Sequence, residues 1–386
     1  MAIQSPTGAP LGRSRTESDV QGKKVEPIVW WAIAGGSVLA FIAYILIRWI
    51  TGPYFVAVDP GPTQVTDWQK SALLAIQVVG SVAAVWCLWH FLVKPWRRDG
   101  KPTTEGLLAL AYGTLYIQDP VSLSGGYWFT YNATMFNRGS WAPYLPLFDA
   151  PSGKPGNMLA EPIFGMGPGY VYFWMIGVAV AFWTLKKTMA RFPRFGVVGG
   201  LVAAYVACVV FDVVIEGLIW MKTGFYAYPG APGPKLFEGG FSAYPFIEGI
   251  LIGFLLTPYA LLRYYKDDKG YTIVERGVDN LRVGKNVKVL LRFLALVAVA
   301  HAIYFFCYNI YAMQIGTHQQ VWPKSVQERS YFLNGVCGQP NGKACAGPGV
   351  PNPREHSSYV DNNGKLVVPD GAPSPDYAPP VLTGKH

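Results

Sequence analysis

Two carboxylates lie within an apolar segment of the chain. Asp212 and Glu216 belong to FDVVIEGLIWMKTGFYAYPG, residues 211–230, which includes part of a run long enough to cross a membrane. Each charge there costs roughly 2.5–3.5 kcal/mol on insertion scales. Four residues apart on a helix, the two side chains point the same way. Because two close carboxyl groups can share one proton, one can serve as acid and the other as base. We predict that Asp212 and Glu216 form a catalytic acid/base pair. Glu248, within a second apolar run, and Asp119, at the end of a third, would hold charge or orient the substrate.

Aromatic and amide side chains in two long connecting segments could bind that substrate. The segments, residues 120–165 and 223–249, mix aromatics, Gly, Pro and single carboxylates such as Glu161 and Glu238. Aromatic walls with few polar groups suit a lipophilic molecule. His301, in the last apolar run, could carry a proton or could be a hydrogen-bonded packing residue. The predicted substrate-binding residues are Tyr131, Asn132, Asn137, Trp141, Tyr228, Tyr244, His301 and Asn309.

The motifs that the sequence lacks narrow the chemistry further. It has five histidines and no HxxxH or HxxHH pattern, which disfavours a histidine-rich di-iron oxygenase. It has no GxxxxGK[ST] motif, no GxGxxG after a strand-like segment and no G-x-S-x-G elbow. We therefore expect no metal and no cofactor. The remaining carboxylates and tyrosines suit proton-transfer chemistry: isomerisation, hydration, dehydration or cyclisation.

The elements that must position these residues are transmembrane helices. Hydrophobic residues make up 51% of the 386 and charged residues 14%, which indicates an integral membrane protein. The net charge of +9 comes from short loops rather than a basic face, so nucleic acid is not an expected partner. We predict an all-α polytopic bundle of about seven helices with long outer loops. The expected spans are 28–50, 70–93, 104–118, 167–186, 196–221, 243–264 and 289–313. The third meets Asp119-Pro120, so it could be a short span or could continue beyond the proline.

Lys and Arg alternate between the two sides of this predicted bundle. They gather in the N-terminal arm and in the loops 94–103, 186–195 and 263–292, and are sparse in the opposite loops. The positive-inside rule then places the N-terminus in the cytoplasm and the C-terminus outside, in a multi-pass protein of the cell membrane. The lipid bilayer is accordingly an expected partner.

Three regions follow from this topology. Residues 1–26 are polar and predicted to be a disordered cytoplasmic arm, 27–313 the transmembrane domain, and 314–386 an extracytoplasmic loop-rich tail. In the tail, Cys337 and Cys345 lie in GVCGQPNGKACAGPG. An outside location favours a disulfide between them. Half a zinc site is the alternative, but no CxxC or nearby His pair supports it.

Several long motifs resemble the AveC-type spirocyclase family of actinobacterial membrane proteins. They are YNATMFNRGSW, DVVIEG, FYAYPGAPG, YPFIEG, YYKDDKGYTIVERGVDNLR and CGQPNGKACAGPGVPNPR. The likeness covers roughly residues 60–370. It implies formation of a spiroketal, in which a dihydroxy-ketone closes twice and loses water. Many members lie outside polyketide pathways, and the resemblance carries no catalytic residues over to this chain.

The residues and the resemblance together predict a membrane-embedded acid/base enzyme. Its expected reaction is closure or dehydration of a lipophilic hydroxy-ketone, through a spiroketal-type cyclisation. One alternative is a carrier or binding protein for a lipid or small hydrophobic molecule, with the carboxylates as proton-coupling groups. Another is a membrane scaffold that positions a partner enzyme through its basic loop.

Overall fold

Six long apolar helices build the protein. The computed structural model describes residues 25–145, 154–350, 353–354 and 357–372. Six of its helical segments are long and apolar enough to cross a membrane: Pro27–Thr51, Asp67–Asp99, Met166–Arg191, Pro193–Thr223, Phe246–Tyr264 and Lys285–Gly316. Their α-helical parts are α1 (Pro27–Thr51), α2 (Asp67–Leu88), α5 (Met166–Arg191), α6 (Gly196–Asp212), α8 (Phe246–Tyr264) and α9 (Lys285–Tyr304). The protein is thus an all-α polytopic bundle, as the sequence predicts.

Three of the spans contain a stretch of wider, π-helical backbone. In order they are η1 (Trp89–Val93) followed by α3 (Lys94–Asp99), η5 (Val213–Trp220) followed by α7 (Met221–Thr223), and η7 (Phe305–Asn309) followed by α10 (Ile310–Gly316). Such insertions are rare and occur frequently at functional sites. Two of these three stretches carry residues of the site described below.

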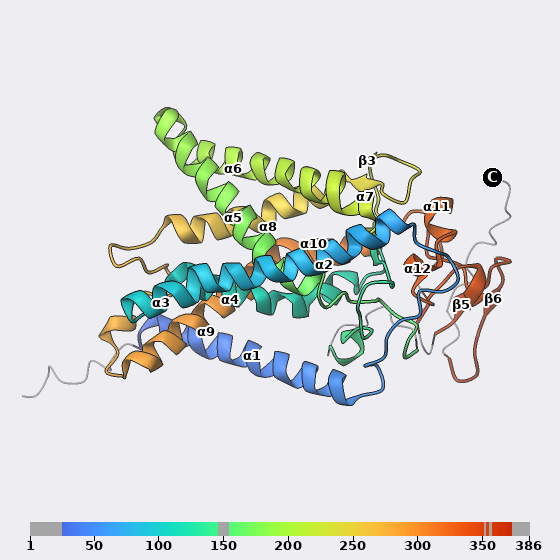
Figure 1. The fold of residues 1–386 in the computed structure, drawn as a ribbon, viewed down its shortest axis with the longest axis horizontal. Coiled ribbons are helices and arrows are strands. Elements are labelled where there is room, and N and C mark those ends of the chain that lie inside the picture. The colour runs from blue at the N-terminus through green and yellow to red at the C-terminus, as the bar shows by residue number, and fades with distance from the viewer. Residues whose placement is uncertain (1–24, 146–153, 351–352, 355–356, 373–386) are drawn as a thin grey trace, which may run out of the picture.

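The helices run back and forth between two ends of the bundle (Figure 1). One end holds the turns α3–α4, α5–α6 and α8–α9, where the sequence concentrates Lys and Arg; we call it the basic end. The other, the loop end, holds the long connections and the C-terminal strands. The predicted alternation of basic loops is therefore present in the fold. The basic residues of the N-terminal arm before Val25 lie outside the described residues.

The third apolar run is not a membrane-length helix, and it is the run that the sequence left open as a short span. It forms α4 (Thr104–Thr114), only 11 residues long, and continues as the 3-10 helix η2 (Leu115–Leu123), which contains Pro120. Proline removes a backbone donor and clashes with the carbonyl four residues before it, so the α-helix ends early. The run still passes from the basic end towards the loop end. Because α4 and η2 are almost wholly buried by other helices, this irregular backbone is shielded from lipid.

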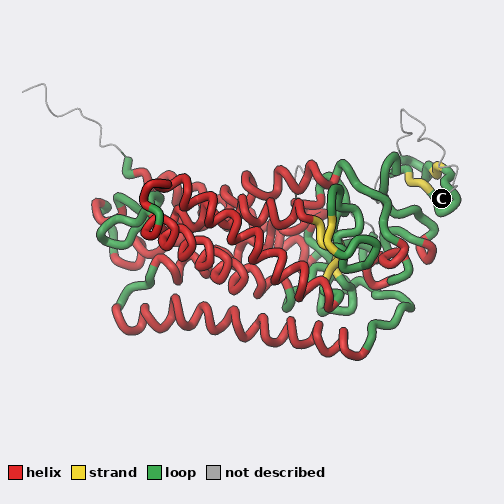
Figure 2. The backbone as a smooth tube through the Cα atoms, turned by 90° about the horizontal axis from the view of Figure 1, so that it is seen from above, coloured by secondary structure: helices red, strands yellow, loops and turns green. Residues whose placement is uncertain are grey.

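Connecting segments and short strand pairs cap the bundle at the loop end (Figure 2). The antiparallel pairs are β1 (Thr130–Tyr131) with β2 (Tyr226–Ala227), β3 (Lys235–Leu236) with β4 (Tyr244–Pro245), and β5 (Tyr359–Val360) with β6 (Leu366–Val367). Short helices complete the connections at this end: η3 (Ala142–Tyr144), α11 (Lys324–Gln327), α12 (Ser330–Leu333) and η8 (Gln339–Asn341). Two more, η4 (Pro193–Phe195) and η6 (Val278–Asn280), lie in the turns of the basic end. A disulfide joins Cys337 to Cys345, the pair expected from the sequence. The end of the predicted tail, 373–386, lies outside the described residues.

Candidate active site

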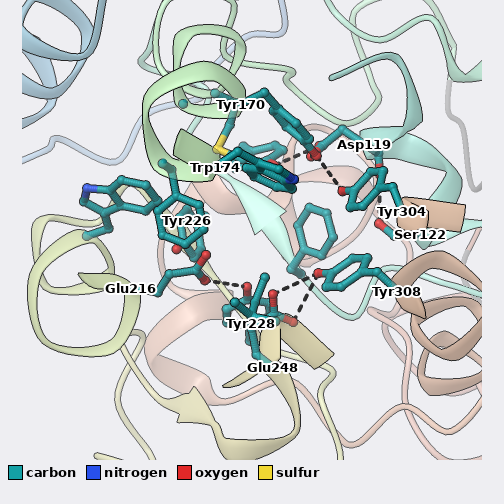
Figure 3. Close-up of a pocket in the computed structure, with 17 residues that line it drawn as sticks. Asp119, Ser122, Tyr170, Trp174, Glu216, Tyr226, Tyr228, Glu248, Tyr304 and Tyr308 are labelled. Atoms are coloured by element: carbon teal, nitrogen blue, oxygen red, sulfur yellow. Dashed lines mark hydrogen bonds between the residues drawn. The ribbon is translucent and has the colours of Figure 1, made fainter. Parts of the chain in front are cut away.

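A cavity lined by acids and tyrosines lies inside the bundle, towards the loop end (Figure 3). Three carboxyl groups reach its wall, those of Asp119, Glu216 and Glu248. The rest of the wall is mostly aromatic and is built by η2, α5, η5, α8, the end of α9, η7 and the capping segments. Its aromatic residues are Phe129, Tyr131, Tyr170, Phe173, Trp174, Trp220, Tyr226, Tyr228, Tyr304 and Tyr308. Segments far apart in the sequence therefore meet at one polar centre.

The first carboxyl centre lies on η5. Glu216 accepts a hydrogen bond from Tyr228 Oη at 3.0 Å. Asp212, which is fully buried one turn earlier, lies beside it and accepts a 2.5 Å hydrogen bond from Tyr244 Oη. The other Asp212 oxygen, Oδ1, has no hydrogen-bond partner among the described residues. This is the arrangement expected where two adjacent carboxyl groups share one proton.

The second carboxyl centre combines η2 with the segment before α5. Asp119 accepts hydrogen bonds from Tyr131 Oη at 2.8 Å and from Tyr170 Oη at 2.6 Å. Glu161, fully buried, lies next to Asp119, and its Oε2 likewise lacks a partner among the described residues. Burial, followed by the charge of Asp119, raises the pKa of Glu161 well above its ordinary value. Burial raises the pKa of Asp119 too, but its tyrosine donors oppose that rise, so we assign the proton of this pair to Glu161.

The third carboxyl, Glu248, lies in the first turn of α8. Tyr308 Oη donates to both of its oxygens, at 2.9 and 3.1 Å. A tyrosine row connects it towards the second centre, because Tyr304 stacks on Tyr308 at 5.4 Å and its hydroxyl lies 2.6 Å from that of Tyr170. Hydroxyl groups thus extend along one wall from Glu248 to Asp119.

Within the described residues, no Lys, Arg or His forms a salt bridge with these five buried acids. The salt bridges found in the described part of the chain involve other carboxylates: Asp67, Asp99, Glu105, Asp279 and Glu275. A buried carboxyl without a cationic partner is stabilised in its neutral form or by hydrogen-bond donors. The tyrosines are the donors here, so the cavity can store protons and stabilise a positive charge on a guest.

The structure brings together some of the residues singled out in the sequence. Asp119, Glu216, Glu248, Tyr131 and Tyr228 all line the cavity. Asp212 and Tyr244 lie behind its wall and contact it through Glu216. These two residues are therefore in contact with the wall of the cavity but do not line it.

Five other predicted substrate-binding residues point elsewhere. The Trp141 indole donates to the Ile117 carbonyl, Asn132 bonds Gly224 and Thr134, and Asn137 bonds the backbone of Val58. Asn309 donates to Gln118 Oε1, and His301 has Thr114 on one ring nitrogen and Gln118 on the other. These side chains hold capping loops and helices together, and His301 occupies the packing position that was the alternative to proton transfer.

Sequence reasoning missed most of the aromatic wall. Tyr170 with Trp174 and Tyr304 with Tyr308 line the cavity, each pair four residues apart on one helix. That spacing places both rings on the same face and was the available signal. Glu161 was recognised only as one of the single carboxylates of its segment, because nothing in the sequence places it beside Asp119.

The cavity is narrow in this conformation. The space open to the centre of a water-sized sphere is about 40 Å³. One water needs roughly 10–15 Å³ by this measure, so only a few waters fit. A larger guest requires side chains of the wall to move.

The described residues contain no group of three or more His, Cys, Asp or Glu that could hold a metal ion.

Residues 96–332 match the family described as spirocyclase AveC-like. The chain belongs to this family. The matched range contains all three carboxyl groups that line the cavity, together with Asp212 and Glu161. No curated protein and no solved structure matches the chain.

Proposed function

We propose that this AveC-like protein is an acid/base cyclase that closes a lipophilic dihydroxy-ketone to a spiroketal with loss of water. The observation that carries the proposal is the aromatic cavity with three carboxyl groups, each hydrogen-bonded by tyrosine and none paired with a cation. Family membership supports the reaction class. A lipophilic guest matches a cavity set within the membrane-length helices.

The reaction makes demands that this cavity can meet. One hydroxyl adds to the ketone to give a hemiketal, whose hydroxyl must then leave as water. An acid supplies the proton for that departure, and an oxocarbenium ion forms. The second hydroxyl attacks this cation and gives its proton to a base. One proton is donated and one is accepted, so the number of protons in the site is unchanged. Transfer of a proton from the base back to the acid then restores the starting state.

Glu216 and Glu248 are our candidates for the two proton-transfer groups. Both line the cavity, and Tyr228 Oη donates to Glu216 from between η5 and α8. Asp212 would hold the shared proton behind Glu216 and so act as a positioning residue. Asp119, with its negative charge held by two tyrosines, would stabilise the oxocarbenium ion across the cavity.

The test is turnover by purified protein in lipid nanodiscs. The probe is an alkyl-substituted 5-oxo-1,9-diol, and the readout is spiroketal formation with its enantiomeric excess, because spontaneous closure is racemic. Glu216→Gln and Glu248→Gln keep the shape and remove the transferable proton. Each should slow turnover by roughly 10²–10⁴-fold. Glu238→Gln, an exposed carboxylate at the same end, should not change it.

Other outcomes point to other functions. Racemic product at the buffer rate would exclude spiroketal catalysis on this probe. Binding without conversion, together with carboxylate-dependent uptake into vesicles, would favour the carrier alternative. Near-normal turnover in a folded Glu216→Gln, Glu248→Gln double variant would refute the assigned residues even if the wild type were active.

A further inference from the structure

A second, apolar hollow runs along the outside of the helix bundle. We call it the α5 groove: it has a volume of about 850 Å³, and α5 forms its floor from Tyr172 to Thr184. From Tyr172 to Thr184 the helix rises by twelve steps of 1.5 Å, or roughly 18 Å. Helices α2 and α6 supply its sides, and its lining residues are Ala83, Trp86, Cys87, Phe91, Tyr172, Met175, Ile176, Ala179, Val180, Trp183, Thr184, Ala207 and Val210.

The groove exists because its two sides diverge. Helices α2 and α6 both pack on α5 but hardly touch each other, and α6 slants away from α2 towards the basic end (Figure 1). Side chains on the rim are open to the surroundings, with Trp183 63% and Val210 56% exposed. All three helices belong to membrane-length spans. The groove therefore faces the hydrocarbon of a bilayer, which is where an alkyl chain partitions.

A single layer of aromatic rings separates the α5 groove from the acid cavity. Tyr172 lines the groove, while the next two residues, Phe173 and Trp174, line the cavity. Trp220, also in the cavity wall, lies 6.4 Å from the Tyr172 ring and 5.2 Å from the Phe173 ring. Gly80 of α2 lets Tyr172 sit close, since a Cβ there would be 3.1 Å from its ring. The Tyr172, Phe173 and Trp220 rings therefore form a partition between the two spaces.

The opposite route, from the loop end, is blocked more heavily. Strands β1 and β2 cover the cavity with Tyr131 and Tyr226. Outside them the α12 segment is fastened to β1, because Thr130 Oγ1 donates to the Phe332 carbonyl and Asn334 donates to Thr130 Oγ1. Phe332 itself is fully buried. Opening the cavity at the loop end would break these buried hydrogen bonds. In the described structure the rings of Tyr172, Phe173 and Trp220 contact one another without a hydrogen bond between them.

We propose that the α5 groove binds the alkyl tail of the substrate and that the Tyr172–Trp220 partition is its passage from the bilayer into the acid cavity. This rests on the proposed function for the identity of the guest. The tail lies along α5, and the oxygen-bearing part passes the partition to reach Glu216 and Glu248. A narrow acid cavity is consistent with this arrangement, because only the oxygen-bearing part of the substrate must enter it.

The test uses a long-chain alcohol carrying a diazirine midway along its alkyl chain, photolysed with the protein in nanodiscs. Mass spectrometry should place the label on residues 172–184 and 207–210. Ala179→Phe fills the groove at an exposed position and should lower this labelling about tenfold. Ala75→Phe, at an exposed position of α2 outside the groove, should leave it unchanged. An excess of the long-chain dihydroxy-ketone should displace the probe.

Further arms decide what the groove holds and where it leads. Displacement of the probe by added phospholipid but not by the ketone would show that the groove binds bilayer lipid, and would overturn the proposal. Labelling that Ala179→Phe does not lower would also overturn it. Tyr172→Ala thins the partition and should increase labelling of the Tyr304–Tyr308 segment several-fold; no increase would refute the passage. Labelling does not require turnover. If the expected labelling of the α5 groove is found but no spiroketal forms, only the proposed reaction is refuted.

Discussion

At the residue scale, the site consists of buried carboxyl groups arranged in two pairs and one single. In each pair one member lines the cavity and the other lies behind it: Glu216 before Asp212, and Asp119 before Glu161. A second carboxyl costs stability unless a proton is shared, because two adjacent negative charges repel in a medium with little water. The rear members are best understood as proton holders for the front members. They keep a donor available without occupying space that a guest needs.

Glu161 provides a pH test of this arrangement. Its pKa is raised in the folded protein by burial and by Asp119, so the folded state binds more protons than the unfolded state. Stability should therefore be greatest below the ordinary glutamate pKa of about 4.3 and decline as the pH rises through the raised value. One extra proton bound by the folded state changes the free energy of unfolding by about 1.4 kcal/mol per pH unit.

Glu161→Gln mimics the protonated form and should flatten this decline. Thermal unfolding in nanodiscs, followed by tryptophan fluorescence at several pH values, measures it. The exposed Glu238→Gln is the matched control and should keep the wild-type slope. An equal slope in wild type and Glu161→Gln would mean that Glu161 does not hold a proton in the folded state.

At the element scale, the α6–α8 contact places the first carboxyl centre. Glycines on α8 allow the two helices to approach closely, with Gly253 against Tyr205 and Gly249 against Val209. The π-helical segment η5 then widens the end of α6, where the Glu216 carbonyl accepts from the amide of Met221, five residues on. Tyr244, arriving from β4, fills the space beside Gly217 and Gly249 and reaches Asp212.

Gly249→Ala tests this packing. The new Cβ would lie 2.6 Å from Tyr244 Oη and would push the hydroxyl away from Asp212. We expect a loss of about 1–3 kcal/mol from crowding, with a further loss from the broken hydrogen bond. Adding Tyr244→Phe should recover the crowding part only.

Chemical denaturation of the two single variants and the double variant measures the coupling. Gly36→Ala in α1, where the new Cβ would meet only Leu294 Cδ1 at 3.9 Å, is the control and should be nearly neutral. Additive losses in the double variant would contradict a direct clash between position 249 and Tyr244.

At the scale of the whole molecule, the two ends of the bundle have different compositions. The basic end carries the ion pairs of the α8–α9 connection, including the buried pair of Arg292 with Glu275 at 2.8 Å. The loop end carries the strand pairs, the disulfide and the cap over the cavity. An asymmetry of this kind predicts a fixed orientation, with the basic end in the cytoplasm. The substrate cavity would then lie in the outer half of the membrane.

Single cysteines at the two ends test the orientation. In a background where Cys87, Cys208 and Cys307 are replaced by Ala, Glu238→Cys at the loop end should react with a membrane-impermeant maleimide in intact cells. Lys269→Cys, whose native side chain is 65% exposed at the basic end, should react only after the cells are opened. The reverse pattern would invert the topology and place the cavity in the inner half.

The sequence by itself determined the class, the helices and the acids. Apolar runs and basic loops identify five of the six long spans within a few residues, because insertion into lipid depends on local composition. The span Asp67–Asp99 extends further than predicted, because α3, which continues it after the π-helical stretch η1, consists largely of charged residues. Asp212, Glu216 and Glu248 stand out for the same reason: a charge in an apolar run is visible without a fold.

Only the tertiary structure decided which side chains face one another. Pro120 ends the α-helix of the third run early, but the irregular backbone of η2 is tolerated only because surrounding segments shield it from lipid, a condition set by packing. Glu161 meets Asp119, and Tyr308 meets Glu248, across separations that no local pattern encodes. Conversely, His301 and Asn309 have the polar character of site residues, but both form side-chain hydrogen bonds with Gln118 of η2. A polar residue type signals that a partner must exist, and the fold alone decides whether that partner is a neighbouring side chain or a substrate.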